Sequence, residues 1–290
     1  MWTINGFEQQ KKFFENLARA SPPAGGLAHA YIFSGPEMIG KKMFARDLFT
    51  IANRMARFAL HDPDLCELAP RLAEGETWIY IDDVRDLKRF LSLKAFQGPY
   101  RFVIIDDAHR MQEAAANAML KALEEPNPMV VFVLVTSQPE LLPQTIGSRC
   151  QHIHFQPYSQ KDMERCLAKY DLARTDRELV AGMAGGRLGW AIQMSEPDNL
   201  KALKKAIGDF ASLLKKPLSE RMQYAKTIYE NEQYGQYVPL WLHWAYSQRE
   251  TLGGPKDAAR ILSGLLDLNY YISQPQYNHR LLLENTLINL

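Results

Sequence analysis

The sequence predicts an α/β domain with a parallel sheet, followed by two all-helical domains. Strand and helix patterns alternate through the first 157 residues, as a parallel sheet with crossover helices requires. From residue 159 onward, apolar residues recur at helical spacing. Gln156 and Pro157 mark the boundary between the two patterns. We therefore expect an α/β domain at 1–157, a small helical lid at 158–199 and a C-terminal helical domain at 200–290.

The elements of the first domain are expected in the following order. A helix over 7–20 leads through a turn-forming stretch at 21–26 to a strand over 29–34. A later run, residues 130–135, is apolar throughout, which is typical of a buried parallel strand. The helix before that run ends at Glu125, because the residue before a proline avoids the α region. The other expected elements are helices at 41–59, 84–93 and 112–125, and strands at 78–81, 101–105 and near 152–155.

Composition excludes several classes of protein. The 290 residues are 47% hydrophobic and 23% charged, which is ordinary for a globular chain. Its three cysteines, Cys66, Cys150 and Cys166, are too few and too far apart for a zinc site, and we expect no metal. The N-terminal residues lack the apolar core of a signal peptide, and no run of about 18 apolar residues predicts a membrane span. A cytoplasmic protein is expected.

Residues 35–42, Gly-Pro-Glu-Met-Ile-Gly-Lys-Lys, form a loop between a predicted strand and a predicted helix. Gly35, Gly40 and Lys41 fit the pattern GxxxxGK, in which backbone N–H groups and the helix N-terminus hold phosphates. That pattern continues with Ser or Thr, whose hydroxyl binds Mg²⁺. Lys42 stands there and supplies a cation in place of an oxygen. A retained turn without nucleotide, residual ATP or ADP binding and hydrolysis are all open. We expect a degenerate Walker A loop that requires no cofactor.

The stretch from residue 117 to 150 ends in Ser148-Arg149-Cys150 and resembles the clamp-loader family of AAA+ ATPases, whose members place ring-shaped clamps on DNA. The resemblance implies an AAA+ P-loop domain, a helical lid and an oligomerisation collar at 200–290. Many members carry a four-cysteine zinc module before the segment that corresponds to 61–64, but here only Cys66 lies nearby. Shorter segments that support the resemblance are residues 29–31, 61–64, 81–87 and 278–285.

In this family the arginine of the triplet reaches into the ATP site of the neighbouring subunit. A permanent charge and a planar fork suit an arginine to stabilise a transferring phosphoryl group. The resemblance therefore implies that Arg149 is catalytic in trans, and that Ser148 and Cys150 hold its loop. A surface arginine with a nearby carboxylate is the alternative.

The resemblance also implies that the chain's own ATP site is altered. Asp106 ends a predicted strand as a Walker B aspartate does, but Asp107 follows where active relatives carry glutamate. Asp107 is one methylene shorter, and capping of a following helix is an equal alternative. Thr136 falls at the position of the first sensor residue, or it only ends a strand. In the lid, Gly189 occupies the sensor-arginine position, and a helix would turn Arg187 about 200° away from it.

By resemblance, the chain would be a rigid subunit of a hetero-pentameric ring, with motor subunits that hydrolyse ATP and a clamp-opening subunit. It would reach the sliding clamp and primed DNA through that complex, since a net charge of +1 gives no bulk attraction to DNA. We expect no intrinsic ATPase activity and no membrane partner. The alternatives are an active AAA+ ATPase, as a motor subunit or helicase-loading relative, and a non-replicative scaffold.

Overall fold

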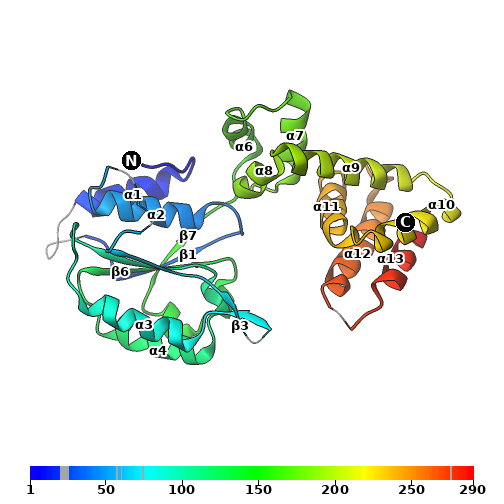
Figure 1. Ribbon diagram of the computed structural model, residues 1–290. Helices are drawn as coiled ribbons and strands as arrows, with labels where there is room; N and C mark the ends of the chain where they lie inside the picture. The colour runs from blue at the N-terminus through cyan, green and yellow to red at the C-terminus, as the bar shows by residue number, and fades with distance from the viewer. Residues whose placement is uncertain (20–25, 57, 60, 74, 275) are drawn as a thin grey trace. The chain divides into compact units, whose positions relative to one another are not determined.

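The computed structural model describes residues 1–19, 26–56, 58–59, 61–73, 75–274 and 276–290, and the chain divides into two compact units (Figure 1). The first unit comprises Met1–Asp162 together with Gly186–Gly189. The second comprises Met163–Gly185 and Trp190–Leu290. The turn predicted over 21–26 lies, apart from Gly26, outside the described residues.

The first unit is built on a parallel five-stranded sheet with the strand order β2-β5-β6-β1-β7. This confirms the predicted fold class. Residues of β6 alternate between two cores, as the two-residue period of a strand requires: Val130 and Phe132 pack on one face, and Val131 and Val133 on the other. The strands are β1 (Ala30–Ser34), β2 (Leu65–Leu68), β5 (Arg101–Ile105), β6 (Val130–Thr136) and β7 (Gln151–His154).

Helices cover both faces of this sheet (Figure 1). One core lies between the sheet and helices α1 (Glu8–Arg19) and α2 (Lys41–Ala52). The other core lies between the sheet and helices α3 (Ile81–Ser92) and α4 (Glu113–Glu124). The short elements of the unit are η1 (Ala108–Arg110), η2 (Pro139–Leu141) and α5 (Gln144–Gly147). Since helices cover both faces of the sheet, a binding site in this unit is expected at the ends of the strands and in the loops that follow them.

One predicted strand of this unit is wrong, and one strand was missed. The strand predicted at 78–81 is not formed, because α3 already begins at Ile81 and the N–H of Tyr80 donates to the Asp83 carboxylate at 2.8 Å. Trp78 instead ends a hairpin of β3 (Arg71–Ala73) and β4 (Glu76–Trp78), and Ile79 forms only an isolated bridge with Met111. Strand β2 of the main sheet was not predicted.

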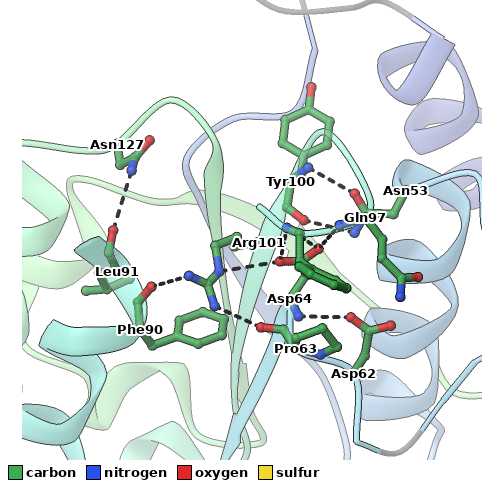
Figure 2. Close-up of polar contacts among 11 residues, drawn as sticks. Asn53, Asp62, Pro63, Asp64, Phe90, Leu91, Gln97, Tyr100, Arg101 and Asn127 are labelled. Atoms are coloured by element: carbon green, nitrogen blue, oxygen red, sulfur yellow. Dashed lines mark hydrogen bonds and ion pairs between the residues drawn. The ribbon is translucent and has the colours of Figure 1, made fainter. Parts of the chain in front are cut away.

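The helix predicted over 41–59 stops at Ala52. Asn53 follows, and its side-chain amide pairs with both backbone groups of Tyr100, accepting from the N–H at 2.9 Å and donating to the carbonyl at 2.9 Å (Figure 2). This contact 47 residues away in the chain ends the helix at a point that local sequence does not mark.

The described part of the second unit is helical apart from its connections, as expected. Its core is centred on Trp241, which stacks on Phe210 with ring centroids 5.0 Å apart and donates its indole N–H to the Ala206 carbonyl at 2.9 Å. The described helices include none that is long and apolar enough to cross a membrane. Helix α9 runs through residue 200, and the predicted lid–collar boundary stays a prediction. The helices are α6 (Gln160–Leu167), α7 (Arg174–Met183), α8 (Leu188–Met194, which begins in the first unit), α9 (Pro197–Leu213), α10 (Leu218–Glu230), α11 (Tyr234–Ser247), α12 (Pro255–Ile272) and α13 (His279–Ile288).

Candidate functional site: the phosphate loop and the Ser-Arg-Cys loop

The glycine-rich loop connects β1 to α2 at the carboxyl edge of the sheet, the position that the motif requires. Its two glycines are needed for their backbone shape. Gly35 has φ 141°, and a Cβ there would collide with the carbonyl oxygen of Phe155. Gly40 has φ 105°, and a Cβ there would lie 2.6 Å from the Ile4 side chain. The strand–helix turn is therefore built as in a phosphate-binding loop.

The ammonium of Lys41 is folded back onto this loop. It donates to the carbonyl oxygens of Gly35 at 2.7 Å and Pro36 at 2.6 Å, and the residue is buried. Burial lowers the pKa of Lys41, and attraction by Asp107, Asp106 and Glu37 opposes that shift. The charge that would meet a phosphate is thus held by the loop's own backbone.

Lys42, in the first turn of α2, reaches the end of strand β5, which is separated from β1 by β6. Its ammonium lies 3.1 Å from a carboxylate oxygen of Asp106 and 3.9 Å from one of Glu67. Glu67 is also held by Arg46 through two bonds of 2.6 Å, and this hydrogen bonding lowers the pKa of the Glu67 carboxyl. Sequence reasoning missed Glu67 and Arg46. One signal was present, since Arg46 stands four residues after Lys42 and so shares its helix face.

Asp107 and Thr136 lie beside this network. Asp107 occupies the position before η1 with φ 45°, but its side chain makes no capping hydrogen bond, so the capping alternative is wrong. Burial and the neighbouring Asp106 raise the pKa of Asp107. Thr136 ends β6 with its hydroxyl 3.1 Å from Nδ1 of His109, and it also accepts the Gln138 N–H at 3.0 Å. His109 was not singled out from the sequence.

Gly189, at the start of helix α8, contacts the phosphate loop within the first unit. The N–H of Gly189 donates to the Met38 carbonyl at 2.6 Å, and a Cβ on Gly189 would lie 2.7 Å from that oxygen. An arginine at this position has no room. Helix α8 begins only at Leu188, so the prediction that a helix turns Arg187 away fails. Arg187 is half-buried near Glu37: burial lowers its pKa and the Glu37 charge opposes that shift.

Arg149 stands just before β7, after the short helix α5. Its guanidinium donates to the Thr145 carbonyl at 2.8 Å and to the Glu124 carboxylate at 2.8 Å. The Ser148 hydroxyl lies 3.3 Å from the same guanidinium. The Cys150 side chain packs against the core under α3 and α4, and burial raises the pKa of its thiol to about 12. The alternative interpretation of Arg149, a surface arginine paired with a nearby carboxylate, requires a partner such as Glu124.

The two motifs lie at opposite ends of two adjacent strands of the sheet. Strands β1 and β7 are parallel neighbours, with Tyr31 paired to Gln151 and Ser34 to His154. The phosphate loop follows the end of β1, whereas Arg149 precedes the start of β7. A strand of this length spans roughly 15 Å at about 3.3 Å per residue. Arg149 therefore does not serve the phosphate loop of its own chain.

The segment at 61–64 has a structural role, although it first stood out as part of the resemblance (Figure 2). The buried carboxylate of Asp64 accepts the N–H of Phe96 at 2.7 Å and that of Gln97 at 2.8 Å. It also lies 3.6 Å from Nε of the buried Arg101, whose guanidinium stacks over the Phe90 ring at 3.8 Å. Asp64 therefore fixes the loop that enters β5, the strand that leads to Asp106.

A Mg²⁺ ion does not fit the residues around the phosphate loop. Lys42 offers no oxygen at the position of the metal-binding hydroxyl. Its ammonium also forms an ion pair with the Asp106 carboxylate, the group that would bind the ion. Over the part of the chain that the structure describes, no three His, Cys, Asp or Glu side chains are grouped so as to hold a metal.

Comparison with known proteins gives one family. Residues 9–159 match the model for "DNA polymerase III, delta subunit". The chain is 34% identical over 159 residues to the DNA polymerase III subunit gamma/tau of Mycobacterium tuberculosis, covering 50% of the chain and 27% of that protein. It is 29% identical over 187 residues to the DNA polymerase III subunit delta' of Bacillus subtilis, covering 59% of the chain and 55% of that protein. The chain thus spans about a quarter of the first relative and about half of the second.

A solved structure supports the fold over nearly the whole chain. It is the DNA polymerase III gamma subunit-related protein of Thermotoga maritima, which is 21% identical and aligns with a TM-score of 0.61. The alignment covers 96% of this chain and 97% of that one. At this identity the likeness establishes the fold alone.

Proposed function

The chain belongs to the DNA polymerase III delta subunit family, among the AAA+ clamp-loader proteins, and from this we propose that it is a delta-prime-like stator of a bacterial clamp loader. Its role would be to help load the sliding clamp on primed DNA during replication. The stator would hydrolyse no ATP itself and would complete the ATP site of an adjacent motor subunit.

The observation that carries this proposal is the separation of Arg149 from Lys41 along strands β1 and β7, since one lies near the start of β7 and the other beyond the end of β1. An arginine at the far end of these strands is of no use to its own phosphate loop, but it is exposed enough to reach a neighbour, with 34% of its side chain accessible. The planar, permanently charged guanidinium is suited to a transferring phosphoryl group. Ser148 and Cys150 support its loop, the first by a polar contact and the second by packing against the core.

The state of the phosphate loop supports the absence of turnover. Lys41 is held by backbone carbonyls, and Lys42 stands at the metal position. Gly189 excludes a sensor arginine, and Asp107 is shorter than the catalytic glutamate. The loop is proposed as a relic that keeps the turn between β1 and α2.

The proposed partners are motor subunits and a clamp-opening subunit in a cytoplasmic hetero-pentamer, joined through a collar at 200–290. The sliding clamp and primed DNA would be reached through that complex. These partners are inferred from the family resemblance alone. The chain matches only parts of its relatives, so their partners are proposed for it and not shown.

An active AAA+ ATPase, as a motor subunit or a helicase-loading relative, is the second candidate. The nearness of Arg187 to Glu37 of the phosphate loop favours it, since this arginine lies close enough to contribute a lid charge. Gly35, Gly40, Lys41 and Thr136 also keep residue types that the nucleotide-site motifs require. Turnover by the isolated chain separates this candidate from the stator.

The test is ATP hydrolysis by the chain alone and in a mixture with a motor subunit, clamp and primed DNA. The chain alone is expected to be silent. In the mixture, Arg149→Ala is expected to slow the one site it completes by about a thousandfold or more, and total turnover only in part. Arg149→Lys tests the need for a fork, and Arg85→Ala, which removes another exposed arginine paired with a carboxylate at 3.1 Å, is the matched control.

Two outcomes would contradict the proposal. Magnesium-dependent turnover by the chain alone would identify a motor. An unchanged rate with Arg149→Ala in the mixture would identify a scaffold that keeps the fold for protein contacts only.

A further inference from the structure

Lys42 stands where the phosphate-loop motif places the hydroxyl that binds the metal ion. In P-loop ATPases that hydroxyl and the Walker B aspartate hold the ion between them. Here the ammonium of Lys42 lies 3.1 Å from Asp106, the residue in the Walker B position. The positive charge of the motif's metal is thus replaced by one carried on the chain.

The charges around this ammonium are already balanced. Lys42 lies between Asp106 and Glu67, and Arg46 donates to both carboxylate oxygens of Glu67 through its Nε and Nη2. Two cations therefore face two carboxylates. Mg²⁺ requires oxygen ligands at about 2.0–2.1 Å in octahedral geometry. It would have to take the Asp106 oxygen from the ammonium and then sit beside a like charge.

We propose that the Lys42 ammonium is a tethered replacement for the divalent cation, which keeps metal out and orders the phosphate loop without metal or nucleotide. The inference deepens the proposed function, since it rests on the assignment of this loop as a degenerate nucleotide site. It gives the substitution at residue 42 a positive role: the lysine holds together the end of β5, strand β2 and the first turn of α2.

The backbone contacts around the loop fit this role. Lys41 is bonded to the carbonyls of Gly35 and Pro36, and Gly189 donates to the carbonyl of Met38. Three carbonyls of the loop are therefore satisfied by the chain itself. An ordered loop of this kind needs no phosphate to define it, provided that the cation at its base is in place.

The experiment uses three variants of the full chain. Lys42→Ser restores a hydroxyl, Lys42→Ala removes the charge without adding a ligand, and Lys42→Arg keeps the charge. Lys216→Ser is the matched control, because it removes another lysine paired with a carboxylate, at 3.2 Å from Glu220. Binding of Mn²⁺ is measured by electron paramagnetic resonance with Mn²⁺ alone and with ADP. Amide hydrogen exchange of residues 37–41 is measured in EDTA and in Mn²⁺ with ADP.

Wild type, Lys42→Arg and the control should bind no Mn²⁺ at the loop, and their exchange should be the same in EDTA and in Mn²⁺. Lys42→Ser should bind Mn²⁺ with ADP at least about tenfold more tightly than wild type, because a repelling charge is replaced by a ligand. Lys42→Ala should lose exchange protection over 37–41 in EDTA by about tenfold or more, since Asp106 and Glu67 lose a shared cation.

Wild type that binds Mn²⁺ and ADP as tightly as Lys42→Ser would overturn the exclusion of metal. Unchanged protection in Lys42→Ala would overturn the ordering role. Both measurements use the isolated chain, and circular dichroism verifies that each variant is folded. The clamp-loader proposal depends on Arg149 in a mixture of subunits, so either inference can fail without the other.

Discussion

The backbone N–H of Gly189 donates to the carbonyl of Met38 at 2.6 Å, and this bond joins the start of helix α8 to the phosphate loop. The approach leaves no space for a side chain, since a Cβ on Gly189 would lie 2.7 Å from the Met38 oxygen. Met38 has φ 58°, which is unusual for a residue with a side chain. The absence of a lid arginine is therefore a packing requirement of this chain and not only a lost charge.

Gly189→Ala should loosen the contact between the lid segment and the loop. The added methyl group meets a backbone oxygen, so we expect a loss of about 1–3 kcal/mol in unfolding free energy and faster amide exchange at Gly189 and residues 38–41. Gly208→Ala is the control, because a Cβ at that position in α9 meets nothing within 4 Å. It should stabilise by up to about 1 kcal/mol. Equal changes in unfolding free energy for the two substitutions would mean that the Gly189 contact does not contribute to stability.

Asp64→Asn should destabilise the first unit by about 3–5 kcal/mol, because it leaves the buried Arg101 guanidinium without its charged partner. The new amide also turns an N–H₂ group toward the donors of Phe96 or Gln97 (Figure 2). Urea denaturation measures the change.

Asp62→Asn is the control for this substitution. The Asp62 side chain accepts one bond, from the Asp64 N–H at 2.9 Å, and an asparagine oxygen can accept it too. A loss of about 1 kcal/mol or less is expected. Similar losses for both variants would show that the Asp64 charge is not what fixes the loop.

The Arg46–Glu67 pair should make stability depend on pH in the acidic range. Hydrogen bonding to Arg46 lowers the pKa of Glu67 in the folded chain. A carboxyl whose folded pKa is lowered stabilises the fold fully above its unfolded value of about 4.3, and this contribution is lost as the pH falls through the folded pKa. Glu67→Gln should therefore lower the unfolding free energy near neutral pH and converge with wild type in acid. A difference that does not change with pH would contradict the pair's role.

The sequence was sufficient for the parts of the fold that local patterns determine. The apolar run at 130–135 and the strand at 101–105 were predicted to within one residue, because a buried parallel strand is recognisable from composition alone. Strand β2 was missed because it is only four residues long, Leu-Cys-Glu-Leu, and contains a glutamate. That glutamate faces Arg46 and Lys42, a pairing that depends on β2 lying beside β5.

The candidate site shows the same division. Gly35, Gly40 and Lys41 were found because spacing defines their motif, and the triplet at 148–150 was found because it resembles that of the clamp-loader family. The Lys42–Asp106 contact joins residues 64 positions apart in the chain, and only the strand order places them together. The helical argument about Arg187 fails because helix α8 begins one residue after it, and the role of Arg187 stays a prediction.

The pairing of Arg149 with Glu124 should contribute little to stability and should not limit the finger. The two side chains are 34% and 50% exposed, and ion pairs at such sites are worth about 0–1 kcal/mol. Glu124→Gln should therefore change the unfolding free energy by no more than about 1 kcal/mol, with a smaller difference at high salt. In a reconstituted loader, ATP turnover should stay at or above the wild-type rate, because the arginine no longer has to leave a carboxylate before it reaches the neighbouring site. Turnover that falls as far as it does with Arg149→Ala would show instead that Glu124 holds the finger in its working position, and the pair would then have to be counted as part of the interface.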